Sequence, residues 1–192
     1  RLLKSMGAEL VTFSPMRDEH LPENLKGLIL GGGYPELNAR ELEANVSMRE
    51  DIHRALNDGM PCLAECGGFM YLHDEMEAMD GNSYHMAGVI SGRAYRTQRL
   101  NRFGYVTLTQ KKEVLGMNDM GGIPAHEFHY FDSENCGDDF DAKKPASHRK
   151  WNCIHGTDTM MAGFPHLYFY GNPKVPEAFL RKCSQYGRQD AR

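Results

Sequence analysis

The chain has 192 residues, of which 41% are hydrophobic and 25% charged, a balance typical of one soluble globular domain with a sizeable core. The net charge of −4 argues against a nucleic-acid-binding protein, whose affinity would come from neutralising phosphates. No apolar run is long enough to span a membrane and no signal peptide opens the chain, so we expect no membrane association. The five cysteines are an odd number without metal-ligand spacing, which favours a cytoplasmic location and no metal site.

The first predicted elements alternate between strand and helix. Residues 1–7 are expected to be the end of a helix stopped by Gly7, and without an initiator Met we expect a fragment of a longer protein. Ala8–Ser14 and Leu25–Leu30 are predicted to be strands. From Glu36 to Asn57 apolar residues recur at helical spacing. Strands separated by helices of this length predict βαβ units and a parallel sheet.

A candidate nucleophile follows the next apolar run. Pro61–Ala64 is predicted to be a buried strand, and Cys66 comes at its end, before Gly67, Gly68 and a helix-compatible segment. This is the arrangement of a nucleophile elbow, in which a sharp strand-to-helix turn exposes a nucleophile at the carboxyl edge of an α/β sheet. The amides that open the helix would favour a thiolate and stabilise a developing oxyanion. From this stretch alone, a buried structural cysteine is the alternative.

The second half is predicted to be mostly strand before a final helix. We expect strands at Met86–Ile90, Gly104–Thr109, Ile123–Tyr130 and Trp151–His155, and the helix at Pro176–Tyr186. No repeat or linker interrupts the chain, so one domain over residues 1–192 is the simplest organisation.

Two further features could complete an active site. Gly31-Gly32-Gly33 ends a strand expected beside the elbow, where its amides could form an oxyanion hole with that of Gly67. The alternative is a plain tight turn. A cysteine nucleophile needs a base, and His166 could supply it, although a histidine in such an apolar setting is more often a core residue.

Two motifs are open to more than one interpretation. In a strand, His126 and His129 would fall on opposite faces, and a third ligand is missing, so His126–Tyr130 does not predict a metal site. Arginines recur at every third position of a segment that we call the Arg ladder, formed by Arg93, Arg96, Arg99 and Arg102. Such a run is either a solvated surface or a site for a polyanionic ligand or a partner domain.

Five motifs together resemble one family, the glutamine amidotransferase domain of cobyrinic acid a,c-diamide synthase, in the cobyric-acid-synthase group of triad-type amidotransferases. They are Leu-Gly-Gly-Gly-Tyr-Pro-Glu (30–36), Ala-Glu-Cys-Gly-Gly-Phe-Met-Tyr-Leu (64–72), Gly-Arg-Ala-Tyr-Arg-Thr (92–97), His-Glu-Phe-His-Tyr (126–130) and Gly-Phe-Pro-His-Leu-Tyr-Phe-Tyr-Gly-Asn-Pro (163–173). They follow the family's order and span nearly the whole chain.

The resemblance implies an α/β, class I glutamine amidotransferase-like (flavodoxin-like) fold of three layers, with a mostly parallel central sheet whose first strand is missing. It implies a glutaminase in which Cys66 attacks the glutamine amide and His166 transfers the proton. The amides of Gly67 and of Gly32 or Gly33 would hold the oxyanion.

The resemblance also implies partners outside this chain. Ammonia would pass to an absent N-terminal domain, where ATP and Mg²⁺ activate the a and c carboxylates of cobyrinic acid, a corrinoid, in cobalamin biosynthesis. This chain would then be the C-terminal part of a two-domain synthase and would itself hold no cofactor.

The sequence departs from better-known triad amidotransferases at two positions. Those enzymes carry a Glu two residues after the catalytic His and a Gln four residues after the nucleophile, whereas this chain has Tyr168 and Met70 there. The resemblance therefore implies a Cys-His dyad whose orienting group, and whose glutamine-binding side chains, are not identified. Two alternatives stay open: the same domain of a nickel sirohydrochlorin a,c-diamide synthase, and a non-catalytic scaffold domain.

Overall fold

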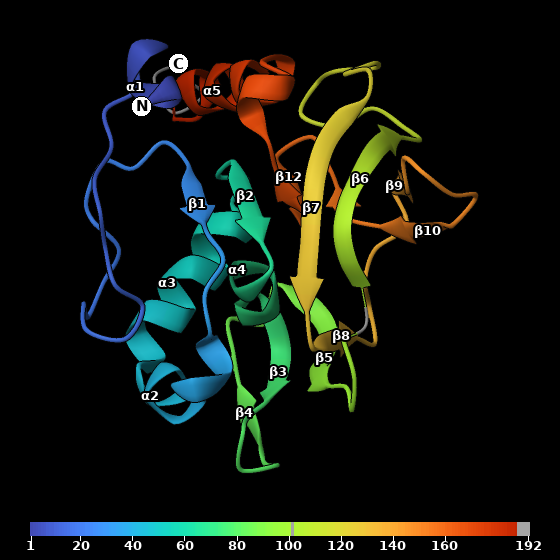
Figure 1. Ribbon diagram of the computed structural model, residues 1–192. Coiled ribbons are helices and arrows are strands. Elements are labelled where there is room, and N and C mark those ends of the chain that lie inside the picture. Colours follow the sequence, from blue (N-terminus) through green and yellow to red (C-terminus); the bar gives the residue numbers. More distant parts are fainter. Residues whose placement is uncertain (101, 188–192) are drawn as a thin grey trace.

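A four-stranded sheet forms the centre of the computed structural model, which describes residues 1–100 and 102–187. Its order is β1 (Leu28–Leu30), β2 (Cys62–Glu65), β12 (Met160–Gly163) and β11 (His155–Gly156). β1 and β12 run parallel to β2 on either side of it, and β11 is antiparallel to β12 (Figure 1). The elbow strand therefore lies inside the sheet, where both edges of its backbone are hydrogen-bonded.

The side chains of β2 divide the core into two parts. Cys62 and Ala64 point into one apolar cluster, and Leu63, on the opposite face, points into the other. This alternation follows from the two-residue period of a strand. All three residues are almost fully buried, as expected of a strand covered on both faces.

Helices cover one face of this sheet. After the short helices α1 (Leu2–Ser5) and η1 (Pro35–Leu37) come α2 (Ala39–Ala44) and α3 (Val46–Asn57), which lie beside β1 in Figure 1. The predicted helix over 36–57 is thus broken at Asn45. The side-chain amide of Asn45 donates hydrogen bonds of 2.8 Å to the carbonyls of Pro15 and Asp18, and this contact with a distant loop competes with helix continuation.

Two further sheets make the architecture mixed, which corrects the predicted mostly parallel sheet and leaves the α/β class of the prediction in place. The first has the order β10-β9-β6-β7-β13 and is antiparallel throughout. The second has the order β4-β3-β5-β8, with only β3 and β5 parallel. The strands are β3 (His73–Glu77), β4 (Ser83–His85), β5 (Ile90–Arg96), β6 (Arg102–Gln110), β7 (Ile123–His129), β8 (Phe131–Ser133), β9 (Phe140–Lys143), β10 (Lys150–Cys153) and β13 (His166–Leu167).

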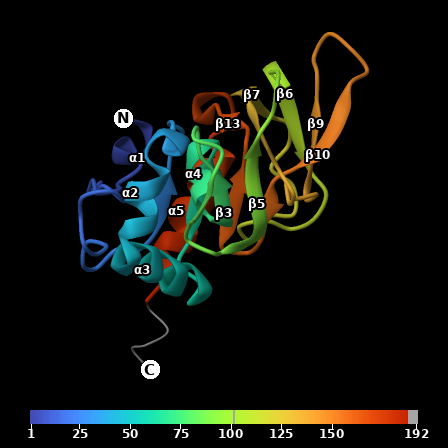
Figure 2. The same cartoon turned by 90° about the horizontal axis from the view of Figure 1, so that it is seen from below.

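The antiparallel sheet lies on the other side of the central sheet from α2 and α3 (Figure 2). Behind β2, the second core cluster joins Leu63 to residues of β6, β7 and the last helix, α5 (Lys174–Gln185). The helix predicted over 176–186 is thus confirmed within two residues. Among the described residues, no helix is long and apolar enough to cross a membrane.

Other predicted elements differ from the structure. Ala8–Ser14 is not a strand, because β1 pairs only with β2 and offers the segment no hydrogen-bonded ladder. Residues 86–89 of the strand predicted at 86–90 are irregular. The N–H of Ala87 donates to the carbonyl of Tyr71, and the N–H of Gly88 donates to the carbonyl of His73 at the start of β3, so these amides do not form a strand ladder. β12, the parallel neighbour of the elbow strand, was not predicted from the sequence.

Four aromatic side chains are exposed on the outer surface of β6 and β7 and just beyond it. We call this surface the aromatic face, formed by Phe103, Tyr105, Phe128 and Tyr130, which are between 46% and 74% exposed. Edge-on ring contacts connect Phe103 to Phe128 and Phe128 to Tyr130. Burial of Glu127 and His129 on the opposite face confirms the predicted alternation of the 126–130 motif.

Candidate active site

Cys66 lies at the predicted turn between a strand and a helix. β2 ends at Glu65, and α4 (Gly67–Tyr71) begins one residue after Cys66. The backbone of Cys66 has φ 48° and ψ −105°, a strained conformation for a residue with a side chain. Its N–H donates to the carbonyl of Gly163 on β12 at 2.9 Å, so the parallel neighbour helps to hold the turn. This is the geometry of a nucleophile elbow.

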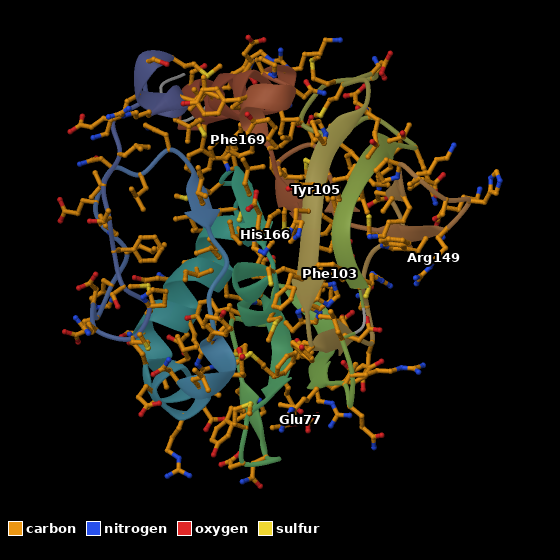
Figure 3. The ribbon with its side chains drawn as sticks, viewed as in Figure 1. Glu77, Phe103, Tyr105, Arg149, His166 and Phe169 are labelled. Atoms are coloured by element: carbon orange, nitrogen blue, oxygen red, sulfur yellow. The ribbon has the colours of Figure 1, made fainter. Side chains whose placement is uncertain are left out.

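The structure brings His166 to Cys66 across 100 positions of sequence. β12 ends at Gly163, opposite Glu65 in the sheet register, and the chain then enters β13 at His166. β13 pairs with β7, which places His166 directly opposite His126. In Figure 3 His166 lies between β2 and β7, near the centre of the molecule.

The surroundings of His166 favour its protonated form. Hydrogen bonding with Cys66, and then with Glu65, raises the pKa of His166 to about 10, against a smaller opposing effect of burial. An imidazolium beside the sulfur is the partner that stabilises a cysteine thiolate. The pair thus has the polarity of an activated cysteine nucleophile.

Glu65 places a carboxylate beside His166, a contact that could not be identified from the sequence. Its Oε2 lies 3.6 Å from His166 Nδ1, and its Oε1 accepts a hydrogen bond of 3.2 Å from the N–H of Leu167. The carboxylate therefore contacts both the imidazole and the backbone that carries it. The sequence signal for Glu65 was a charged residue at the end of an otherwise apolar strand. Tyr168 stands where better-known triad amidotransferases carry their Glu, and its side chain is 59% exposed.

The three glycines of the predicted oxyanion hole converge on the same turn. An added Cβ on Gly32 would lie 2.5 Å from the Cε1 atom of His166, so this glycine packs directly against the imidazole. An added Cβ on Gly67 would lie 3.0 Å from the backbone nitrogen of Gly33. Gly67 is also the first residue of α4, so its N–H has no acceptor within the helix.

A pocket of about 360 Å³ opens onto these groups. Cys66, His166, Gly32 and Gly33 line it on one side, and residues of β7 and the following segment line the other. Its volume is within the range of small-molecule sites. The remaining lining side chains include Met70 and also Glu36 and Arg96, two residues that were not predicted from the sequence to lie at the site.

The other four cysteines lack this environment. Burial raises the pKa of Cys62 and Cys153 to about 12 and that of Cys136 and Cys183 to about 11. These thiols stay protonated at neutral pH, and a protonated thiol is a poor nucleophile.

The Arg ladder does not form one surface. Arg93 pairs with Glu134 at 3.5 Å, and Arg102 lies over the ring of Trp151 at 5.4 Å from its centroid. Arg96, at the end of β5, lines the pocket. Side chains of a strand alternate between its two faces, so arginines three residues apart lie on opposite faces. The regular spacing in the sequence therefore does not place the four arginines on one surface.

Comparison with known families identifies the domain. Residues 1–173 match the family described as the CobB/CobQ-like glutamine amidotransferase domain. The chain belongs to this family. Among its curated relatives, a cobyrinate a,c-diamide synthase of Caldanaerobacter subterraneus subsp. tengcongensis is 38% identical over 97% of this chain. A cobyrinate a,c-diamide synthase of Picrophilus torridus is 40% identical over 95% of it. The chain spans only 42% and 39% of the length of these two relatives.

Solved structures support the amidotransferase fold. A crystal structure of a glutamine amidotransferase aligns with a TM-score of 0.64 at 17% identity, covering 95% of this chain and 90% of that one. A crystal structure of a GMP synthase component from Thermoplasma acidophilum aligns with a TM-score of 0.60 at 18% identity, covering 100% and 89%. At such identities the likeness concerns the fold alone.

Proposed function

We propose that this domain hydrolyses glutamine to glutamate and ammonia, as the glutaminase part of a cobyrinate a,c-diamide synthase. The observation that carries the proposal is the group of Cys66, His166 and Glu65 at a strained elbow beside a pocket. These are a nucleophile, its proton-transfer partner and an orienting carboxylate, the three roles that amide hydrolysis through a covalent intermediate needs.

In the proposed mechanism, the thiolate of Cys66 attacks the side-chain carbonyl carbon of glutamine. The resulting oxyanion accepts hydrogen bonds from the amides of Gly67 and of Gly32 or Gly33. The imidazolium of His166 donates its proton to the leaving nitrogen, so ammonia departs and a glutamyl thioester remains. His166 then takes a proton from water, which attacks the thioester and releases glutamate and the Cys66 thiolate.

The product ammonia fits a role in a longer synthase. In this proposal an ATP- and Mg²⁺-dependent synthetase part, outside this chain, activates the a and c carboxylates of the corrinoid cobyrinic acid, and ammonia then displaces the activating group. The supporting observation is the name shared by relatives that are more than twice as long as this chain. The same domain serving nickel sirohydrochlorin is the alternative, because an ammonia-producing site does not contact the tetrapyrrole.

The aromatic face gives the synthetase part a place to dock. Phe128 and Tyr130 line the pocket and continue into Phe103 and Tyr105 outside it, so the face forms one rim of the pocket. Ammonia that reaches water is diluted and mostly protonated to ammonium, which is not a nucleophile, so direct transfer would be more efficient with the consuming site over this rim. Exposed aromatic residues are typical anchors of protein interfaces.

The test uses the full-length synthase, with glutamine and with ammonium salts as nitrogen sources. Cys66→Ser is expected to abolish amidation with glutamine and to leave amidation with ammonia largely intact. Cys136→Ser, which removes a thiol away from the elbow, is the matched control and should retain both activities. Equal loss of both activities in Cys66→Ser would contradict the proposal, and turnover by Cys66→Ser with glutamine would show that another group is the nucleophile.

A scaffold domain without turnover would be distinguished by labelling. A glutamine analogue carrying an electrophile is expected to alkylate Cys66 and none of the other four thiols. Absence of labelling, with the domain folded, would favour the scaffold.

A further inference from the structure

The pocket at Cys66 contains two opposite charges that hydrolysis of an amide does not require. Glu36 reaches it from η1, and Arg96 reaches it from the end of β5. They are the only carboxylate and the only guanidinium among the described residues that line this pocket. A carboxylate and a guanidinium therefore share the pocket with Cys66, and the proposed hydrolysis uses neither of them.

Neither charge has a protein partner among the described residues. No carboxylate of residues 1–100 or 102–187 lies within ion-pair distance of the Arg96 guanidinium, whereas Arg93, three residues earlier, pairs with Glu134. Glu36 likewise has no cationic partner in the described chain, and partial burial raises its pKa. The Glu36 carboxylate is partly buried, and a partly buried charge without a partner is costly, so a ligand of the opposite charge would offset that cost. The Arg96 side chain is exposed, so its guanidinium is accessible to a ligand that enters the pocket.

A free amino acid matches this pair of charges. Glutamine presents a neutral amide at one end, and a carboxylate and an ammonium group at the other. Arginine binds carboxylates through two parallel hydrogen bonds, and a partly desolvated carboxylate is a natural acceptor for an ammonium group. With the amide at Cys66, the two charged groups of glutamine would meet the two charged groups of the pocket.

We infer that Arg96 binds the α-carboxylate of glutamine and that Glu36 binds its α-ammonium group. The inference rests on the proposed glutaminase function and names how that site recognises its substrate. It also accounts for Met70, which lines the pocket where better-known triad amidotransferases carry a Gln. The polar contacts that a thioether cannot make come from η1 and β5 instead.

Steady-state hydrolysis of three amides tests the subsite. They are glutamine, glutamine α-amide, which lacks the carboxylate, and N-acetylglutamine, which lacks the ammonium group. Arg96→Gln is expected to lower kcat/KM for glutamine roughly 10- to 100-fold, the usual effect of losing hydrogen bonds to a charged group, and to leave the α-amide unaffected. Glu36→Gln is expected to affect glutamine in the same range and to leave N-acetylglutamine unaffected. Arg99→Gln, in the same ladder but outside the pocket lining, is the matched control and should change nothing.

Calorimetry separates this inference from the proposed function. Cys66→Ser, which cannot form the thioester, is expected to bind glutamine, and the additional change Arg96→Gln should weaken that binding by a similar factor. If wild type hydrolyses glutamine and Arg96→Gln changes neither binding nor the preference for glutamine over its α-amide, the subsite is wrong and the glutaminase stands. If wild type binds glutamine through Arg96 without hydrolysing it, the glutaminase is wrong and the subsite stands. Equal losses with all three amides would also overturn the subsite.

Discussion

At the scale of single residues, Glu65 has an unusual position next to Cys66, the proposed nucleophile. One carboxylate contacts the imidazole of His166 and the N–H of Leu167, so it fixes both the ring and its backbone. In the usual triad the acid follows the His along the chain, whereas here it precedes the Cys. The positioning carboxylate therefore moves with the elbow strand, and its distance from Cys66 is set by adjacent peptide bonds.

The first prediction at this scale concerns Glu65→Gln. The amide side chain keeps an acceptor for Leu167 N–H but removes the negative charge that favours the imidazolium. The pKa of His166 should fall from about 10, although hydrogen bonding with Cys66 keeps part of the increase. We expect kcat for glutamine hydrolysis to fall at least about tenfold with little change in KM, because the residue positions the proton-transfer partner. NMR titration of His166 and the pH profile of kcat measure the two effects, and an unchanged His166 pKa would contradict this role.

Stability should also depend on pH through His166. Its pKa is raised from 6.5 to about 10, so the folded protein binds the proton more tightly than the unfolded chain does. This contribution to the free energy of unfolding is fully present below about pH 6.5 and is lost as pH rises towards 10. Denaturant unfolding of wild type and His166→Gln should therefore give a stability difference that moves against wild type between pH 6.5 and pH 10. Subtracting His166→Gln cancels the titrating groups that do not interact with His166, and a pH-independent difference would show that His166 is not selectively protonated in the folded state.

At the scale of elements, the close contact of α4 with β1 determines which residues the elbow tolerates. An added Cβ on Gly68 would lie 2.1 Å from the carbonyl oxygen and 2.5 Å from the carbonyl carbon of Leu30. The N–H of Gly68 donates to the carbonyl of Gly31 at 3.0 Å, so the helix cannot move away without losing that bond. The glycine is required here by contact distance, since its φ is not in the left-handed region.

We therefore expect Gly68→Ala to lower the free energy of unfolding by about 1–3 kcal/mol, the usual cost of overpacking a rigid core. Gly31→Ala is the matched control, because nothing lies within 4 Å of its added Cβ, and it should stay within about 0.5 kcal/mol of wild type. Urea unfolding measures both variants. Equal midpoints for the two would mean that α4 can shift away from β1.

The elements that could be predicted from the sequence are those whose pattern is local. The elbow, the strand at 25–30 and the last helix follow from apolar runs and turn residues, and the structure has all three, with the strand limited to Leu28–Leu30. The strand at 8–14 was wrong and β12 was missed, because whether an extended segment becomes a strand depends on a partner from elsewhere in the chain. For the same reason Cys66 and the glycines were predicted, whereas Arg96 and Glu36 could be placed in the pocket only by the fold.

At the scale of the whole molecule, one buried ring connects the parts that form the site. Phe164 lies between the end of β12 and His166, and its ring is 5.1 Å from that of Phe69 on α4. On the other side it stacks on His129 of β7, with ring centroids 4.0 Å apart and nearly parallel planes. The helix after Cys66 and the segment that carries His166 are therefore held together by packing between the central sheet and the antiparallel sheet.

The aromatic face lies on the same antiparallel sheet, and its role is a prediction for the longer protein. Phe103 and Tyr105 are 57% and 74% exposed, do not line the pocket, and are labelled in Figure 3 along β6 and β7. Replacing both by Ser removes aromatic area without touching Cys66, His166 or Glu65. Because the two rings are largely in water, the double variant should fold with nearly unchanged stability.

If the synthetase part covers this face, the double variant Phe103→Ser/Tyr105→Ser should hydrolyse glutamine at a near-normal rate but deliver less of the ammonia to product. Aromatic anchors at the centre of an interface each contribute about 2 kcal/mol or more of binding free energy. Losing two of them should weaken the contact between this domain and the synthetase part, so that ammonia escapes to solvent. The measurement is the ratio of amide formed to glutamate released in the full-length synthase. Val46→Ser removes an apolar side chain that is 48% exposed on α3, outside the pocket lining, and should leave the ratio at its wild-type value. A double variant with the wild-type ratio would mean that ammonia is transferred without contact at this face.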